Sequence, residues 1–424
     1  MDAAPADEPS PADAPSGAEA TGFLHHNLKV ASAVSFLQDT ASEMIYPVLP
    51  FLVTSLLGAN AAALGFIEGL ADATASITKV VSGRLSDSTS RRPLVAAGYG
   101  ISSLGKVILA ASTVWPMVAA ARFTDRLGKG MRGPPRDAII ADDATVANRG
   151  RSFGFHRAAD TAGAVCGPLI GLAIYEALGQ ELRPLLWIAV VPAVLSAGLV
   201  FLIRERPHAR GPAEARPGFA TLPPRFWRLM GFIALFSLVN FPDALLLLRA
   251  KDLGYGFAGV TFLYVLYNLS YAALSYPAGH YSDRLGRRRV FALGLGVFAV
   301  AYLGFGLTTT TAWLWLIMPV YGAYTALTDG VSRAWVADLV PAADRGTALG
   351  VHAAISGVGL LVAGVWAGLA WNGTGHGPFI VSGVIVAALA LGLALGGRAL
   401  DPRPPSPSDS AQPDSATLDT QEPR

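Results

Sequence analysis

The decapeptide "GRLSDSTSRR" at residues 83–92 returns as "GHYSDRLGRR" at residues 279–288, an offset of 196 positions. The same offset, without a gap, pairs further residues on the far side of the motif: Ala141-Asp142 with Ala337-Asp338, and His156 with His352. Chance does not keep one register over such a length, and self-similarity at a fixed period marks an internally repeated architecture. The chain is therefore predicted to contain two related halves.

The composition is that of a membrane protein. Of the 424 residues, 52% are hydrophobic and only 15% are charged, whereas a soluble domain carries about 25% charged residues. A membrane-spanning helix needs about 20 mostly apolar residues. Twelve segments are candidates, of which the fourth is the exception in carrying many charges: 30–57, 61–82, 93–113, 116–141, 152–175, 185–203, 227–249, 257–278, 289–309, 312–336, 348–371 and 378–397. The predicted fold is an all-α integral membrane protein with twelve transmembrane helices in two pseudo-symmetric six-helix bundles.

Arginines in the connecting loops predict the orientation. With the N-terminus inside, sixteen arginines fall in the loops on the cytoplasmic side, and three basic residues fall in the opposite loops. This bias is what the positive-inside rule expects of a multi-pass protein of the inner (plasma) membrane with both termini cytoplasmic. The predicted organisation is a disordered tail at 1–28, a six-helix bundle at 29–203, a linker at 204–226, a second bundle at 227–397 and a disordered tail at 398–424.

The fourth span is unusual because it contains "DRLGKGMRGPPRD", residues 125–137. By the offset of the repeat, residues 121–143 correspond to 317–339, which form a clearly apolar span. A charged side chain at the bilayer centre costs about 2.5–3.5 kcal/mol on insertion scales. The charged groups of the fourth span are therefore predicted to face the bundle interior or an aqueous cavity, where the adjacent prolines are also tolerated.

Charged side chains inside membrane spans are candidates for function. Five basic residues lie on two adjacent stripes of the fourth span, and some of them are predicted to contact an anionic or zwitterionic cargo. The alternative is that they form internal ion pairs with nearby acids such as Asp125, Asp137 and Asp160. The predicted cavity residues are Arg122, Arg126, Lys129, Arg132, Arg136, Asp329 and Arg333.

Carboxylates in the first two spans suit proton coupling. Asp39 and Glu43 lie one helical turn apart on one face, and the repeat places Leu235 and Val239 at the equivalent positions of the second half. A carboxylate in a low-dielectric cavity can exchange a proton near neutral pH, and a nearby arginine opposes protonation. The predicted proton-coupling residues are Asp39, Glu43, Glu68 and Asp72.

The motifs resemble those of the major facilitator superfamily over about residues 28–397. The two G-x-x-x-D-x-x-x-R-R loops resemble its signature loop, and this resemblance implies a conformational latch at Gly83, Asp87, Arg91 and Arg92 and at Gly279, Asp283, Arg287 and Arg288. Gly163, Gly167, Pro168 and Gly171 resemble its antiporter motif, and Arg126 resembles the arginine of its fourth-span motif. Two departures are visible: Ser90 replaces the usual glycine of the first loop, and Lys129 and Arg132 stand where drug exporters are neutral. "DGVSRAWVADLVP" and "GKGMRGPPRDAIIAD" resemble a bacterial branch of the superfamily, and that resemblance implies no particular substrate.

The resemblance implies a secondary transporter of a small molecule that works by alternating access. The span-five motif favours proton-coupled efflux by antiport, and the alternative is a proton symporter that imports an organic anion. A membrane sensor or enzyme is a remote alternative. The sequence shows no ATP-binding loop, so transport is not expected to be driven by ATP. No cofactor, metal or nucleic-acid partner is expected either, because there is one cysteine and the basic residues are scattered among apolar runs. The expected partners are the cargo, protons and the bilayer, with the protein as a monomer. The single cysteine, Cys166, is expected to be buried.

Overall fold

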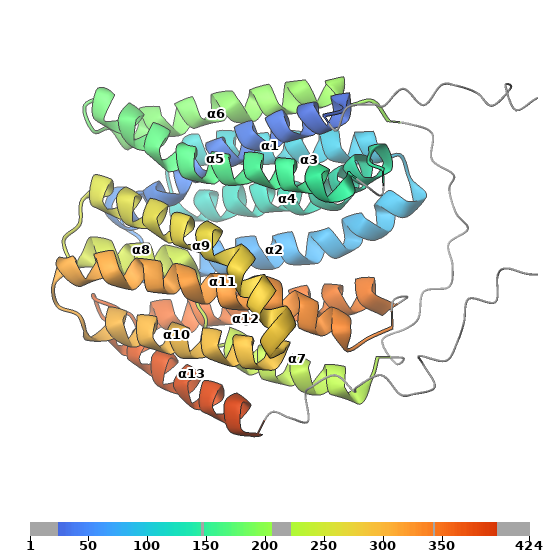
Figure 1. Cartoon of the computed structure of the whole chain (residues 1–424). Coiled ribbons are helices and arrows are strands. Elements are labelled where there is room, and N and C mark those ends of the chain that lie inside the picture. The colour runs from blue at the N-terminus through green and yellow to red at the C-terminus, as the bar shows by residue number, and fades with distance from the viewer. Residues whose placement is uncertain (1–23, 146–147, 206–221, 342–343, 397–424) are drawn as a thin grey trace, which may run out of the picture. The chain divides into compact units, whose positions relative to one another are not determined.

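The computed structural model describes residues 24–145, 148–205, 222–341 and 344–396, and all regular elements in these ranges are helical (Figure 1). The predicted tails therefore lie almost entirely outside the described residues. The α-helices are α1 (His26–Ile45), α2 (Ala61–Ser88), α3 (Arg91–Ala110), α4 (Trp115–Asp143), α5 (Arg149–Ala177), α6 (Leu182–Leu199), α7 (Pro224–Ser237), α8 (Asp243–Asp252), α9 (Phe257–Leu285), α10 (Arg287–Leu307), α11 (Leu314–Asp338), α12 (Arg345–Leu369) and α13 (His376–Gly396). A 3₁₀ turn at Tyr46–Val48 and a π-helical segment at Phe51–Leu56 extend the first span beyond α1.

Within the described ranges, seven helices are long and apolar enough to cross a membrane by length and composition alone. They comprise α3, α5, α9, α10, α12, α13 and the segment Leu182–Leu202, which contains α6. The other five spans of the twelve-helix arrangement correspond to α1, α2, α4, the pair α7–α8, and α11. The predicted all-α, twelve-span fold class is confirmed.

The seventh span differs from the prediction, because the segment 227–249 is not one continuous helix. The helix α7 ends at Ser237 and α8 begins at Asp243. Pro242 has no N–H to donate to the carbonyl of Leu238, as a continuous helix would require. The indole Nε1 of Trp366 donates to that carbonyl instead, at 2.7 Å. A tryptophan of α12 thus replaces the hydrogen bond lost at the break.

The fourth span is a single helix, as predicted, although it contains Pro134 and Pro135. Pro135 cannot donate to the carbonyl of Met131, four residues earlier. The buried hydroxyl of Ser82 on α2 donates to this carbonyl at 2.5 Å. A neighbouring hydroxyl therefore satisfies the backbone group that the proline leaves, as membrane helices with internal prolines require.

The described helices cluster into two compact units. Of the described residues, the first comprises 24–46, 78–112, 120–145 and 148–205, and the second comprises 47–77, 113–119, 222–341 and 344–396. In the first unit α1 packs against α5 and α6, and α3 packs against α6. In the second unit α7 packs against α12, and α10 packs against α11 and α13. The pairs α1–α5 and α7–α12, like α3–α6 and α10–α13, are equivalent under the sequence repeat. The predicted boundaries of the two bundles, 29–203 and 227–397, remain a prediction.

Cys166 on α5 is exposed, so its predicted burial is wrong. The buried face of α5 is formed by small residues that include Gly163, Gly167 and Gly171. Successive residues of a helix are about 100° apart around its axis. Cys166 therefore lies about 100° around the helix axis from Gly167, at the edge of this face, where its side chain is exposed.

Candidate functional site

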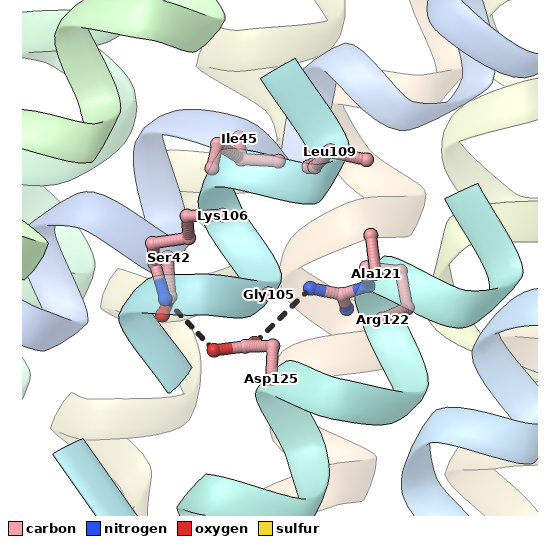
Figure 2. Close-up of a pocket in the computed structure, with 8 residues that line it drawn as sticks. All are labelled: Ser42, Ile45, Gly105, Lys106, Leu109, Ala121, Arg122 and Asp125. Carbon is pink, nitrogen blue, oxygen red and sulfur yellow. Dashed lines mark hydrogen bonds and ion pairs between the residues drawn. The ribbon is translucent and has the colours of Figure 1, made fainter. Parts of the chain in front are cut away.

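Asp125, the first residue of the charged stretch in α4, belongs to a buried ion cluster (Figure 2). Asp125 lies 2.8 Å from the Nζ of Lys106 on α3 and 3.7 Å from the guanidinium of Arg122, one turn earlier on α4. All three side chains are at least nine-tenths buried. They line a cavity of about 10 Å³, which is about the space needed for one water molecule. This cluster has the character of a structural ion network, because a cargo cannot fit within it.

Two further basic residues of α4 also have partners inside the first unit. Arg132 donates to the hydroxyl of Ser102 at 2.5 Å, stacks 4.6 Å from the ring centroid of Tyr99, and lies 3.9 Å from the carboxylate of Asp39. Arg136 donates to Ser35 at 2.7 Å and to the adjacent Asp137 at 2.9 Å.

These contacts distinguish between the two roles predicted for the basic residues of α4, which are cargo binding and internal ion pairing. Arg122, Arg132 and Arg136 bind side chains of α1, α3 and α4 within the first unit. The internal pairing predicted as an alternative is therefore present for these three residues.

Lys129 differs from these three residues. Its electrostatic neighbours are Arg126 and Arg132 on α4, and Asp39 and Glu43 on α1. Over the ranges that the structure describes, it forms neither a hydrogen bond nor an ion pair at contact distance. Lys129 is thus a partly buried cation next to two carboxylates, held by none of them.

The antiporter-type motif fixes the position of those carboxylates. The helix α5 runs against α1 so closely that a Cβ on Gly163 would lie 2.9 Å from the carbonyl oxygen of Phe36 and 3.2 Å from the Cβ of Asp39. A Cβ on Gly167 would lie 2.7 Å from the carbonyl oxygen of Thr40 and 2.9 Å from the Cβ of Glu43. Gly171 makes a similar approach to Met44, and Pro168 is buried in the same helix. The motif glycines therefore leave room for the turn of α1 that bears Asp39 and Glu43.

The predicted proton-coupling residues divide between the two units. Asp39 and Glu43 belong to the first unit, whereas Glu68 and Asp72, in the first part of α2, belong to the second. In the second unit Glu68 and Asp72 are electrostatic neighbours of Asp243 on α8. The hydroxyl of Tyr321 donates to Asp243 at 2.6 Å.

Asp329 and Arg333, the cavity residues predicted on α11, pair with each other in the second unit. The hydroxyl of Tyr271 on α9 also donates to Asp329 at 3.0 Å.

The two signature loops make equivalent contacts in their respective units. Arg91 pairs with Asp142 at the end of α4, and Arg287 pairs with Asp338 at the end of α11, at 3.0 Å. Both members of the second pair are 196 positions after those of the first, so the repeat extends to the contact itself. Asp283 also contacts Arg287, at 2.5 Å. The side chain of Asp87 lies outside the described atoms.

The second arginine of each loop binds backbone carbonyls near the end of the last helix of its half. Arg92 donates to Phe201 at 2.7 Å, and Arg288 donates to Leu393 at 2.9 Å. Gly279 and Gly83 lie on the preceding helices, where a Cβ on Gly83 would meet Pro134 at 3.8 Å.

The serine that replaces a glycine in the first loop has a backbone explanation. Gly286 has a φ of 90°, a conformation that favours glycine. Ser90 has a φ of −60°, which any residue adopts. The first loop enters its helix by a different turn, so it does not require a glycine there.

Glu205 is a functional candidate that the sequence reasoning missed. Its two carboxylate oxygens accept hydrogen bonds from the backbone N–H groups of Arg91, at 2.6 Å, and Arg92, at 3.2 Å. A carboxylate at this position satisfies donors that a helix leaves unpaired and interacts favourably with the helix dipole. Glu205 therefore caps α3 at the start of the latch segment.

Replacing Glu205 with alanine is expected to destabilise the start of α3 by about 0.5–2 kcal/mol, as for other lost N-caps. Amide hydrogen exchange at Arg91, Arg92 and Leu94 should become several-fold faster, because about 1–2 kcal/mol corresponds to a factor of about 5–30 in the opening equilibrium. Glu181→Ala is the matched control, because Glu181 precedes α6 without making a side-chain cap. Equal exchange in the two variants would contradict the capping role.

Lys106 is the second residue that the sequence reasoning missed. Its signal was present, since it is a lone lysine within the apolar third span. Such a residue is costly in a membrane unless it is paired, and its partner Asp125 was visible in the next span.

A multi-pass helical fold of two repeated halves, with buried charge clusters and equivalent loop contacts, is typical of membrane transporters. The family model for the Major Facilitator Superfamily matches residues 31–248 and 229–421. An uncharacterized MFS-type transporter of Methanocaldococcus jannaschii is 33% identical over 380 residues, covering 88% of this chain and 94% of the relative. The chain belongs to the Major Facilitator Superfamily.

More distant similarities extend to proteins with named activities. The class G tetracycline resistance protein of Vibrio anguillarum is 26% identical over 295 residues, covering 65% of this chain and 72% of that protein. The crystal structure of a mutant form of the nucleoside transporter NupG aligns with a TM-score of 0.75 at 16% identity, over 87% of this chain and 99% of that one. The structural likeness concerns the fold alone.

Proposed function

We propose that the protein is a proton-coupled exporter of an anionic or zwitterionic organic compound, working by antiport. The observation that carries this proposal is the arrangement of Lys129 beside Asp39 and Glu43 in the first unit. A proton on either carboxylate removes a negative charge next to the lysine, and an acidic group of the cargo can take its place there. Cargo and proton then compete for one set of charges, which is the simplest form of exchange coupling.

The proposed cargo contact is chosen by asking which basic residues of α4 already have partners within the protein. Arg122, Arg132 and Arg136 are engaged by Asp125, Asp39, Ser102, Ser35 and Asp137. Lys129 is therefore the first choice for a cargo contact, with Arg126 as the neighbouring cation. An acidic group on the cargo suits this pair, and a basic group on the same molecule suits Asp39 or Glu43.

Export is favoured by two observations. The α5 glycines at the antiporter-type motif contact the α1 turn that bears the carboxylates, and a relative is named as a tetracycline resistance protein. The orientation proposed is that of the arginine bias, with both termini cytoplasmic in the inner membrane. Proton symport that imports an organic anion is the second candidate, because Lys129 serves an incoming anion equally well.

Tetracycline is a zwitterion and provides a direct test of direction. In everted vesicles with an acidic lumen, antiport predicts that the protein accumulates tetracycline and that a protonophore abolishes the accumulation. Import by symport predicts accumulation in right-side-out vesicles instead. If the gradient drives no tetracycline movement in either vesicle orientation, tetracycline is not a cargo. Simpler organic anions would then be tested in the same way.

Replacing Lys129 with glutamine is expected to raise the apparent KM for tetracycline by about tenfold or more, because a hydrogen bond to a charged group contributes about 1.5–3 kcal/mol. Glu43→Gln is expected to abolish accumulation driven by the pH gradient while leaving membrane insertion intact. Lys29→Gln, at an exposed lysine near the start of α1, makes the same charge change and should leave both quantities unaltered. An unchanged KM in Lys129→Gln would contradict the proposed contact.

A further inference from the structure

His156 and Asp160 form a buried pair on α5 that the proposed cargo contacts do not use. The Nε2 of His156 lies 3.7 Å from the Oδ1 of Asp160. This distance is too long for a hydrogen bond, and among the described residues neither atom has a hydrogen-bond partner. His156 is 3% exposed, and its other ring nitrogen lies 3.4 Å from the hydroxyl of Ser32. Two buried polar atoms thus face each other, and neither is satisfied by a hydrogen bond among the described residues.

The charges around the pair favour binding of a single proton. Asp39 approaches from α1, Arg136 and Lys129 from α4, and Arg157 from α5 itself. The cations oppose a positively charged imidazole, and Asp39 opposes a second negative carboxylate beside it. A proton on the Asp160 carboxyl meets both conditions. A small approach of the two side chains then lets this carboxyl donate a hydrogen bond to Nε2, which satisfies both buried atoms. The Asp160 side chain is the more accessible of the two, at 14% against 4% exposure, so the proton reaches the pair through Asp160.

The internal repeat shows that the pair is specific to the first half. His352 is equivalent to His156, but the position equivalent to Asp160 is Ser356, and the position equivalent to Asp39 is Leu235. The second half therefore keeps the histidine and lacks both of its acidic neighbours. If the histidine served only for packing, its two copies would have similar neighbours. The acidic neighbours of His156 therefore indicate a role that His352 does not share.

We propose that His156 and Asp160 together bind one exchangeable proton, and that this pair takes up the proton that the neighbouring Asp39 and Glu43 carboxylates then exchange with the cargo. The proton arrives from water, forms the O–H bond of the Asp160 carboxyl and leaves again as a proton; no other bond changes. The role in coupling rests on the proposed antiport, whereas proton binding by the pair does not.

Proton binding can be measured on the purified full chain in detergent, without cargo and without a gradient. Potentiometric titration between about pH 8 and pH 5, the range in which histidine chemistry is accessible, counts the protons taken up. The wild type is expected to take up one proton more than His156→Gln and one more than Asp160→Asn. Because coupled groups share their titration steps, the double variant is expected to lose no more than either single variant. The conservative Asp160→Glu variant, which retains the carboxyl group, is expected to restore the uptake.

His352→Gln is the matched control, since it removes the equivalent histidine that lacks an acidic neighbour. The proton lost on Asp160→Asn should be lost equally in the presence and absence of His352→Gln. Unchanged uptake in either single variant, or loss of two protons in the double variant, overturns the proposal. Failure of tetracycline transport leaves this titration unaffected, so the two proposals can fail separately.

Discussion

Asp125→Asn is expected to reduce the free energy of unfolding by about 3–5 kcal/mol, the cost of removing one partner from a buried ion pair. Asp125 is the carboxylate between Lys106 and Arg122 in Figure 2. Its loss leaves two buried cations without their shared counter-charge. Lys106→Met is expected to cost less, because Asp125 then keeps Arg122.

A double-mutant cycle isolates the coupling between Lys106 and Asp125. The Lys106→Met/Asp125→Asn protein should be more stable than Asp125→Asn alone, because the uncompensated lysine is gone. Thermal or denaturant unfolding in one detergent measures all four proteins. Asp137→Asn is the control, since the side chain of Asp137 is 49% exposed and such pairs contribute about 0–1 kcal/mol. Similar losses for Asp125→Asn and Asp137→Asn would refute a structural role for the cluster.

The helix that carries Asp125 shows where sequence reasoning succeeds. The register of the repeat placed residues 125–137 in a membrane helix against their local composition, and α4 is that helix. The prediction holds because equivalent segments of two related halves occupy equivalent membrane spans, even where one copy carries more charges.

The partners of the α4 charges were less accessible to sequence reasoning. Spacing places Asp125, Lys129 and Arg132 on one stripe, but the stripe faces different neighbours along its length. On α3, Lys106 pairs with Asp125 and Ser102 accepts a hydrogen bond from Arg132. Lys129 lies between these two residues of the stripe and is close to the acidic residues of α1. A helical wheel describes one helix, whereas partner choice depends on which residues neighbouring helices bring to each turn.

The break between α7 and α8 and the Glu205 cap were missed for related reasons. Pro242 was visible in the sequence, but the helix could have kinked or ended there. Its outcome depends on whether a donor such as Trp366, more than a hundred residues away, satisfies the freed carbonyl. Glu205 lies in a linker without periodicity, so its position at the start of α3 follows only from the packing of the first unit.

Gly167→Ala is expected to lower pH-driven transport by about tenfold or more while the protein still inserts into the membrane. The added Cβ would lie 2.7 Å from the carbonyl oxygen of Thr40 and 2.9 Å from the Cβ of Glu43. Both contacts involve the α1 backbone or its first side-chain atom, so no flexible group can yield. Overpacking of this kind costs about 1–3 kcal/mol, and here it moves the turn that carries the proposed coupling carboxylate.

Gly154→Ala separates this displacement from the general effect of alanine in a helix. Gly154 lies on the same helix as Gly167, and a Cβ there has open space around it. Alanine in place of a helical glycine is favourable by about 0.5–1 kcal/mol, so Gly154→Ala should transport like the wild type and unfold no earlier. The comparison is made with initial rates of tetracycline accumulation in everted vesicles, normalised to the amount of inserted protein. Wild-type transport by Gly167→Ala would show that the close approach of α5 to α1 serves packing alone, and the antiporter-type motif would then lose its proposed role in placing Glu43.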